Sequence, residues 1–171
     1  MRKLTILATL NKIIIYTDGS ARGNPGPGGY GAVLMAGNMR KELSEAFRRT
    51  TNNRMELLAV IRSLQALKRS DLPIEIHTDS RYVCDAVTKG WLKNWQRIGF
   101  KDKKNPDLWR MLIPYLAQFN PRFFWVKGHN GHPLNERCDQ LATEAADNGP
   151  FKIDEYFEGE EKAQKDSGLF K

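Results

Sequence analysis

The stretch Ile13-Ile14-Ile15-Tyr16-Thr17-Asp18-Gly19-Ser20 decides the fold. Its apolar and mostly β-branched residues predict a strand that is buried on both faces, and Asp18 closes the run. A second short strand, Ile74–Thr78, is followed in the same way by Asp79. Strand ends in an open α/β sheet converge on one edge, where such folds place their sites. We therefore expect the two carboxylates to lie close together.

The rest of the chain alternates between predicted strands and helices. Residues 19–29 are rich in glycine and proline and predict an irregular loop. Further strands are predicted over 30–36, 40–47 and 122–126, the first two of these joined as a hairpin through Gly37-Asn38. This order predicts an α/β fold with a mixed five-stranded sheet, three antiparallel strands followed by two parallel ones, and helices on both faces.

Helices are predicted over 51–68, after Ser80, over 91–98, over 106–118 and from Pro133 onward. Asn53 and Glu56 have the spacing of a capping box at the start of the first helix. Pro114 is expected to kink or shorten the helix that Pro106 begins, because proline lacks the backbone donor that a helix interior needs.

Composition and charge narrow the class of protein. The 171 residues fit one domain, and the net charge is +7. Residues 151–171 hold four lysines and six acids, a net charge of −2, which leaves +9 on residues 1–150. A basic body indicates a polyanionic partner, with nucleic acid as the first candidate and an anionic membrane surface as the second. No run approaches the ~20 apolar residues that span a bilayer.

Four carboxylates carry the candidate chemistry. Glu56 lies in the first turn of its helix and Asp139 two turns into the last helix, each on the flank of an apolar stripe. Taken singly, each acid has an ordinary explanation as a turn residue, a helix-dipole partner, a strand end or a solvated face. Gathered with Asp18 and Asp79, they would raise each other's pKa unless a divalent cation neutralised them. Oxygen ligands without His or Cys suit a hard cation, so we predict a metal site that cuts nucleic acid.

From Ile13 to Ala146 the chain resembles type 1 ribonuclease H, the cellular enzyme that cuts the RNA strand of RNA–DNA hybrids. The resemblance extends to the fold and covers nearly the whole body. In chain order it is carried by Tyr16-Thr-Asp-Gly-Ser20, Gly23-Asn-Pro-Gly-Pro-Gly-Gly-Tyr-Gly31, Thr50-Thr-Asn-Asn-Arg-Met-Glu-Leu57, Thr78-Asp-Ser80, Val126-Lys-Gly-His-Asn-Gly-His132 and Asn135-Glu-Arg-Cys-Asp139.

The resemblance implies roles for the acids. Asp18 would bridge two Mg²⁺ ions, Glu56 and Asp79 would complete the ligands of one ion, and Asp139 those of the other, with Mn²⁺ as a substitute. One ion would activate water and the other stabilise the leaving oxygen, giving 5′-phosphate and 3′-hydroxyl ends. His129 matches the family's loop histidine, which aids proton transfer or product release. His132 is interpreted as structural.

The resemblance also implies how the hybrid is held. RNA is distinguished from DNA through its 2′-hydroxyl, which a protein reaches across a shallow minor groove. The resemblance places Asn24, Asn52 and Asn53 in this groove. The resemblance also implies that a pocket for one phosphate of the DNA strand is formed by Arg49, Thr51 and Asn105.

The segment 89–104 carries a net charge of +5 and resembles the family's basic protrusion. The resemblance implies that Lys93 and Arg97 contact the hybrid, and that Tyr82, Trp91 and Trp95 line a channel for the sugars of the DNA strand. The alternative is a generic amphipathic helix with core tryptophans and solvated lysines.

Domain organisation follows from these assignments. We expect an N-terminal extension over 1–11, a ribonuclease H catalytic domain over 12–149 and an acidic, flexible C-terminal tail over 150–171. No hybrid-binding domain precedes Ile13, so assisted processive cutting is not expected. The ending Ser167-Gly-Leu-Phe170 weakly resembles peptides that dock on replication clamps, but disorder is the interpretation we favour. Cys84 and Cys138 have no zinc-binding spacing, which favours free thiols in a reducing compartment. We further expect a monomeric cytoplasmic protein without membrane contact.

Other functions remain as alternatives. DNA-strand-transfer enzymes, resolvases and exonucleases share this fold and acid cluster, but they lack the combination of the Gly-Asn-Pro-Gly loop with Thr-Asn-Asn. A non-catalytic hybrid-binding module would have lost at least one of the four acids. A nucleotide-phosphate site would need a Walker loop or a GxGxxG turn after the first strand, and neither occurs.

Overall fold

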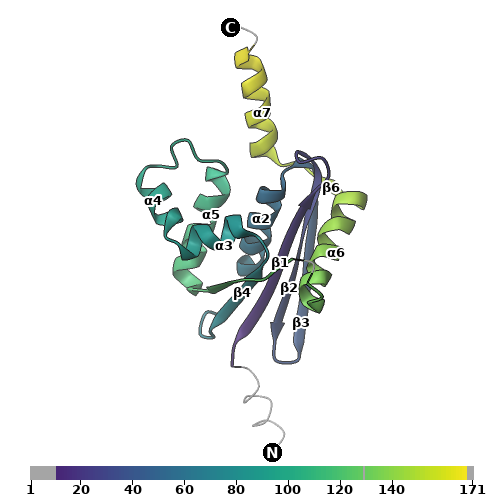
Figure 1. Ribbon diagram of the computed structural model, residues 1–171, viewed down its shortest axis with the longest axis vertical. Coiled ribbons are helices and arrows are strands. Elements are labelled where there is room, and N and C mark those ends of the chain that lie inside the picture. The colour runs from purple at the N-terminus through teal and green to yellow at the C-terminus, as the bar shows by residue number, and fades with distance from the viewer. Residues whose placement is uncertain (1–10, 129, 169–171) are drawn as a thin grey trace, which may run out of the picture.

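The computed structural model describes residues 11–128 and 130–168 (Figure 1). In this part of the chain one mixed sheet has the strand order β5-β4-β1-β2-β3-β6. Its strands are β1 (Ile13–Ala21), β2 (Gly26–Ala36), β3 (Met39–Thr50), β4 (Ile74–Thr78), β5 (Arg122–Trp125) and β6 (Phe151–Lys152). The first three strands are antiparallel, and β4, β5 and β6 each pair in parallel. The predicted mixed α/β fold is confirmed, with one strand more than expected.

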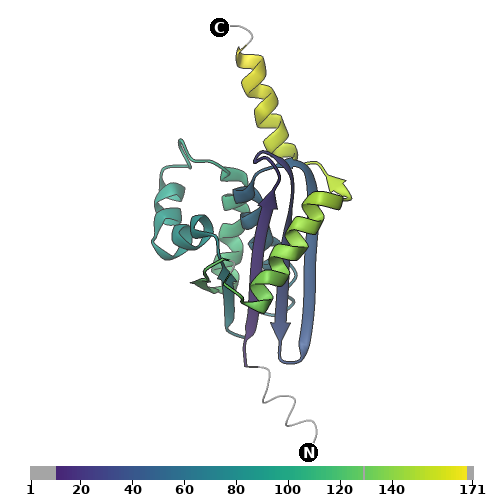
Figure 2. The same ribbon diagram turned by 45° about the vertical axis from the view of Figure 1, so that its right-hand side comes forward.

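Helices cover both faces of this sheet, as predicted (Figures 1 and 2). They are α2 (Asn52–Gln65), α3 (Arg81–Thr88), α4 (Trp91–Arg97), α5 (Pro106–Phe119), α6 (Pro133–Asn148) and α7 (Glu155–Gly168). Successive side chains of a strand point to opposite faces, so Ile13 and Ile15 join the larger core with α2 and α5, whereas Tyr16 meets Cys138 of α6. None of the described helices is long and apolar enough to cross a membrane.

The glycine-rich segment is mostly strand, and the prediction of a loop over 19–29 was wrong. β1 continues to Ala21 and β2 begins at Gly26, which leaves only residues 22–25 between them. The glycines are needed for packing: a Cβ on Gly31 would lie 2.3 Å from the carbonyl oxygen of Cys138, and one on Gly29 would lie 2.6 Å from the Cβ of Ala145. They let α6 lie close against β2, which fixes the position of the helix that carries Asp139.

Two details of the helices also differ from the sequence-based expectation. The N-cap of α2 is Thr51, whose hydroxyl accepts a hydrogen bond from the backbone N–H of Arg54 at 3.2 Å, so the expected capping box at Asn53 does not form. Ser80 caps α3 as predicted, with its hydroxyl 3.2 Å from the backbone N–H of Val83. α5 continues through Pro114 to Phe119, because its apolar face is held in the core on both sides of the proline.

The C-terminal segment is ordered where a flexible tail was expected. Phe151 and Lys152 pair with β3 as β6, and α7 follows. Asp154, between the two, is only 8% exposed and binds Arg54 of α2, a long-range contact that local composition cannot reveal. α7 has no buried residue and projects away from the end of the sheet (Figures 1 and 2).

Candidate active site

Three carboxylates converge at one edge of the sheet. Asp18 lies in β1, Asp79 directly follows β4, and Glu56 lies in the first turns of α2. β1 and β4 are parallel neighbours with Thr17 opposite Thr78, so both strands deliver their acids to the same edge. One oxygen from each of the three side chains lies within 4.8 Å of the other two.

Gly19 allows α2 to reach this edge. Its backbone N–H donates a 2.8 Å hydrogen bond to Oδ1 of Asp18. A Cβ at this position would lie 2.3 Å from the backbone nitrogen of Glu56 and 2.6 Å from the carbonyl carbon of Met55. Only glycine therefore lets the start of α2 approach β1 closely enough to place Glu56 beside Asp18.

Replacing Gly19 with alanine is expected to push the start of α2 away from β1. We predict a loss of at least about 1–3 kcal/mol in the free energy of unfolding, because backbone atoms cannot yield easily to the added methyl group. Mg²⁺ binding, measured by calorimetry, should weaken in parallel. Gly159→Ala is the matched control, since α7 leaves open space there and alanine should stabilise the helix by about 0.5–1 kcal/mol. Equal urea midpoints for Gly19→Ala and the parent protein would refute this close-approach argument.

The electrostatics of the cluster call for a cation. Burial, and then the charge of Asp79, raise the pKa of Asp18 to about 7. Burial, and then the charges of Asp18 and Asp79, raise the pKa of Glu56 well above its ordinary value. The buried Oε2 atom of Glu56 has no hydrogen-bond partner among the described residues. Carboxylates that repel one another, with this one Glu56 oxygen lacking a donor among the described residues, fit a hard divalent cation.

Asp139 approaches the cluster from the other face of the sheet. It is half-buried and is not one of the three acids within 4.8 Å of one another, but its charge contributes to the raised pKa of Asp18. Its neighbour Cys138 donates from Sγ to the carbonyl oxygen of Tyr16 at 3.2 Å, which ties α6 to β1. The structure therefore places a group of three acids with the fourth nearby.

The loop after β5 passes beside the cluster. A Cβ on Gly128 would lie 2.8 Å from Oδ2 of Asp79, so the backbone of this loop runs close to the carboxylate. His129 lies outside the described residues, and its predicted role remains a prediction. His132 packs against Tyr16, with its Nε2 3.1 Å from the tyrosine hydroxyl and the rings 4.8 Å apart.

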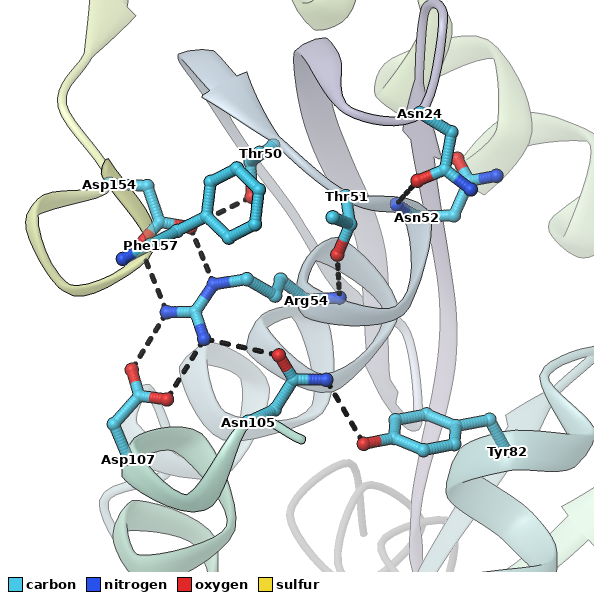
Figure 3. Close-up of polar contacts among 10 residues, drawn as sticks. All are labelled: Asn24, Thr50, Thr51, Asn52, Arg54, Tyr82, Asn105, Asp107, Asp154 and Phe157. Carbon is cyan, nitrogen blue, oxygen red and sulfur yellow. Dashed lines mark hydrogen bonds and ion pairs between the residues drawn. The ribbon is translucent and has the colours of Figure 1, made fainter. Parts of the chain in front are cut away.

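Of the three asparagines predicted to contact RNA, two link the start of α2 to the end of β1 and to the turn that follows it; Figure 3 shows the contact between Asn24 and Asn52. The side-chain oxygen of Asn24 accepts from the backbone N–H of Asn52 at 3.0 Å. The side-chain oxygen of Asn52 accepts from the backbone N–H of Ala21 at 2.5 Å. Asn53 is exposed at the same end of α2. The structure brings all three together next to Glu56.

Two of the three predicted phosphate-pocket residues, Thr51 and Asn105, line a groove of about 530 Å³, and Arg49 does not. The hydroxyl of Thr51, the N-cap of α2, accepts a hydrogen bond from the backbone N–H of Arg54. The side chain of Asn105 accepts a hydrogen bond from the guanidinium of Arg54 at 3.3 Å and donates one to the hydroxyl of Tyr82 at 3.0 Å (Figure 3). Arg49 forms a two-point ion pair with Glu161 of α7 at 2.6 and 2.7 Å. The pairing of Arg49 with the tail was not anticipated from sequence.

The predicted channel residues do not share one environment. Trp91 is 44% exposed on α4, and Lys93 and Arg97 are exposed on the same helix. Tyr82 and Trp95 instead pack against the buried ring of Trp109, whose indole N–H donates to the hydroxyl of Tyr82 at 2.9 Å. The structure therefore brings Tyr82 and Trp95 into the edge of the core and leaves Trp91 open to a partner.

Comparison with known proteins identifies the family. The family model described as RNase H matches residues 10–147. The chain belongs to the ribonuclease H family. A ribonuclease H from Desulforamulus reducens is 52% identical over 150 residues, covering 85% of this chain and 94% of the relative. One from Pseudoalteromonas atlantica is 49% identical over 155 residues, covering 88% of this chain and all of the relative.

Solved ribonuclease H structures agree with this assignment. A type 1 RNase H with the type 2 active-site motif is 32% identical, with a TM-score of 0.72, covering 80% of this chain and 72% of its own. LC11-RNase H1, solved in complex with an RNA/DNA hybrid, is 28% identical with a TM-score of 0.57, covering 80% of this chain and 97% of its own. The predicted resemblance to type 1 ribonuclease H, and with it a nuclease fold, is confirmed.

Sequence reasoning missed a buried ion network beside this ribonuclease H site. Arg54 is 3% exposed, binds both oxygens of Asp107 at 2.8 and 2.7 Å, and binds both oxygens of Asp154 at 2.6 and 2.9 Å (Figure 3). Arg54 precedes the buried Leu57 and Leu58 by three and four positions, which places it on the buried face of α2. That spacing was a signal that Arg54 is buried and needs a counter-charge, although it does not identify Asp107 and Asp154 as the partners.

Proposed function

We propose that this chain is an endonuclease that hydrolyses the RNA strand of RNA–DNA hybrids. It uses two divalent ions, Mg²⁺ with Mn²⁺ as a substitute, and leaves 5′-phosphate and 3′-hydroxyl ends. The observation that carries the proposal is the convergence of Asp18, Glu56 and Asp79 on a ribonuclease H fold, with a buried carboxylate oxygen that lacks a donor among the described residues. The complex of LC11-RNase H1 with a hybrid supports the substrate class.

The acids would hold the ions in the arrangement that the family resemblance implies. Asp18 would contact both, Glu56 and Asp79 one, and Asp139 the other. When bound, the ions supply Lewis acidity that lowers the pKa of the attacking water and stabilises the leaving oxygen. The chain itself contributes the frame that positions the acids, because Gly19 admits the start of α2 close to Asp18. His129 is proposed to move a proton or to aid product release.

The hybrid would lie across the start of α2 and the basic segment. Asn24, Asn52 and Asn53 are proposed to contact the RNA strand, whose 2′-hydroxyl both donates and accepts hydrogen bonds. The predicted channel of Tyr82, Trp91 and Trp95 and the phosphate pocket of Arg49, Thr51 and Asn105 would hold the DNA strand. Trp91 is the most accessible of the three aromatic side chains, and the hydroxyl of Tyr82 accepts a hydrogen bond from Asn105.

The chemistry of the product ends tests the proposed reaction. RNA fragments from a hybrid cut in Mg²⁺ should be degraded by an exonuclease that requires a 5′-phosphate and extended by a polymerase that requires a 3′-hydroxyl. EDTA should stop the cutting. Fragments with 3′-phosphate or cyclic phosphate ends, formed without metal, would instead indicate attack by the RNA's own 2′-hydroxyl and would contradict the proposal.

Removing both cations of α4, by Lys93→Ala with Arg97→Ala, is expected to raise KM and to make hybrid binding less salt-dependent. Each phosphate contact that is lost should reduce the slope of log K against log salt by about 0.9. Binding is measured in EDTA over a range of salt concentrations. Lys68→Ala with Arg69→Ala, which removes the same charge beyond the other end of α2, is the matched control. If both double variants kept the parent slope, α4 would face solvent in the complex.

We also propose that the protein acts as a cytoplasmic monomer with a catalytic domain over 12–149. The support is the pair of buried free thiols, Cys84 and Cys138, which suit a reducing compartment. The weak contact with a replication clamp remains a prediction, because Leu169 and Phe170 of that motif lie outside the described residues.

A further inference from the structure

α7 begins on a buried anchor. Asp154 accepts from the Thr50 hydroxyl at 2.8 Å, and its backbone carbonyl accepts from the N–H of Glu158 at 2.9 Å. It also binds the buried guanidinium of Arg54, as Figure 3 shows. The guanidinium of Arg54 lies 5.3 Å from the ring centre of Tyr156. The start of α7 is therefore fixed to β3 and α2 by groups that are out of solvent.

The body of α7 is held differently. It buries no residue, and its ion pairs with β3 are partly exposed: Glu158 with Arg48 at 2.9 Å, and Glu161 with Arg49 at 2.6 Å. The two arginine side chains are 56% and 43% exposed. Exposed ion pairs stabilise weakly and are screened by salt. The helix therefore has a fixed start and a body that can be displaced.

This body forms one wall of the groove of about 530 Å³. Tyr156, Phe157, Glu160, Glu161 and Gln164 of α7 face the opposite wall, to which Lys103, Lys104, Asn105 and the start of α2 contribute. α7 has five acids and two lysines, a net charge of −3, against a body of +9. This anionic helix thus forms one wall of a groove whose other wall carries two lysines and an asparagine, and two of its carboxylates pair with Arg48 and Arg49 of β3.

We propose that α7 is an internal competitor for nucleic acid, and that Glu158 and Glu161 lower the affinity for the hybrid by holding Arg48 and Arg49. A phosphodiester strand displaces these two carboxylates while Asp154 keeps the start of the helix in place. Because the helix remains tethered, its effective concentration is high, and weak ion pairs are enough to compete. This inference rests on the proposed function.

Charge-removing variants of the full-length chain test the competition. Glu161→Gln and Glu158→Gln are each expected to lower the Kd for a hybrid in EDTA by about twofold to fivefold, the range that one exposed ion pair supports. The double variant should gain roughly tenfold at low salt, with the gain shrinking as salt rises because screening already weakens the pairs. Asp166→Asn is the matched control, because it makes the same charge change on the same helix and Asp166 forms no ion pair with any described residue.

Hydrogen exchange provides a second readout that does not depend on a variant. Saturating hybrid in EDTA should speed exchange of the amides of 160–168, because the displaced helix body loses its ion pairs, while the amides of 50–54 stay protected. Slower exchange along the whole of α7 would mean that the helix contacts the hybrid instead of yielding to it, and would overturn the proposal. An unchanged Kd in the double variant would overturn it as well.

These outcomes are separable from failure of the proposed function. If the parent protein does not cut hybrids in Mg²⁺, the function fails whatever the variants bind. If it does cut, and Glu158→Gln with Glu161→Gln binds no more tightly than Asp166→Asn, only the competition is refuted, and the two ion pairs are then structural contacts of α7.

Discussion

Replacing Asp18 with asparagine should abolish cleavage and leave hybrid binding largely intact. Asp18 is the acid through which both proposed ions are held, and loss of several kcal/mol of transition-state stabilisation corresponds to roughly a thousandfold lower rate. Single-turnover cleavage and binding in EDTA separate the two effects. Asp71→Asn, which changes an exposed acid after α2, should cut normally. Cleavage by Asp18→Asn at a near-normal rate would remove Asp18 from the metal site.

The same substitution should stabilise the metal-free protein. Because burial and Asp79 raise the pKa of Asp18 to about 7, the folded state disfavours its ionised form. The resulting loss of stability is absent below pH ~4, where the carboxyl is protonated in both states, grows between pH ~4 and 7, and is complete above pH 7. Asp18→Asn should therefore raise the free energy of unfolding by about 2–4 kcal/mol at pH 8 and by less at pH 5. Urea unfolding in EDTA at the two pH values measures this, and a larger gain at pH 5 would contradict the assigned cause.

Replacing Arg54 with methionine has the second-largest expected effect. Arg54 neutralises Asp107 and Asp154, and its removal leaves two carboxylates in a largely buried place without a counter-charge. Breaking a buried pair in this way costs about 3–5 kcal/mol. Arg69→Ala, which removes an arginine from an exposed pair with Asp71, should change stability by less than about 0.5 kcal/mol.

Arg54→Met should also loosen two structures that share its guanidinium. Asn105 loses one of its two side-chain contacts, and Asp154 loses the anchor that starts α7. We therefore expect α7 to become protease-sensitive before the body unfolds. A destabilisation below about 1 kcal/mol, with α7 still resistant, would show that the network contributes little.

The sequence was most informative where one local pattern determines one position. The apolar runs ending at Asp18 and Asp79 predicted parallel strands with converging acids, and the 3.6-residue period of α2 placed Glu56 beside them. The family resemblance rested on those same residues. Such positions depend on short-range periodicity, which sequence records directly.

Sequence reasoning failed where a contact between distant segments overrides local composition. Gly29 was predicted to lie in a loop, but it is a strand residue. Because Gly29 and Gly31 lack side chains, α6 can lie close against β2. The acidic segment after Pro150 was predicted to be a flexible tail, but Asp154 is held by Arg54, which lies 100 residues earlier in the chain. Thr51 caps α2 in place of Asn53 because the chain leaves β3 only at Thr50. For the two glycines and for Asp154 the partner lies far along the chain, and no local pattern identifies it.

The most direct test of the proposed function is a comparison of four substrates. The purified protein is incubated with a labelled RNA–DNA hybrid, duplex RNA, duplex DNA and single-stranded RNA, each with Mg²⁺ or with EDTA. We predict Mg²⁺-dependent cutting of the RNA strand in the hybrid alone. Cutting of duplex DNA, or binding of the hybrid without cutting, would contradict the proposed substrate or the proposed catalysis while leaving the fold intact.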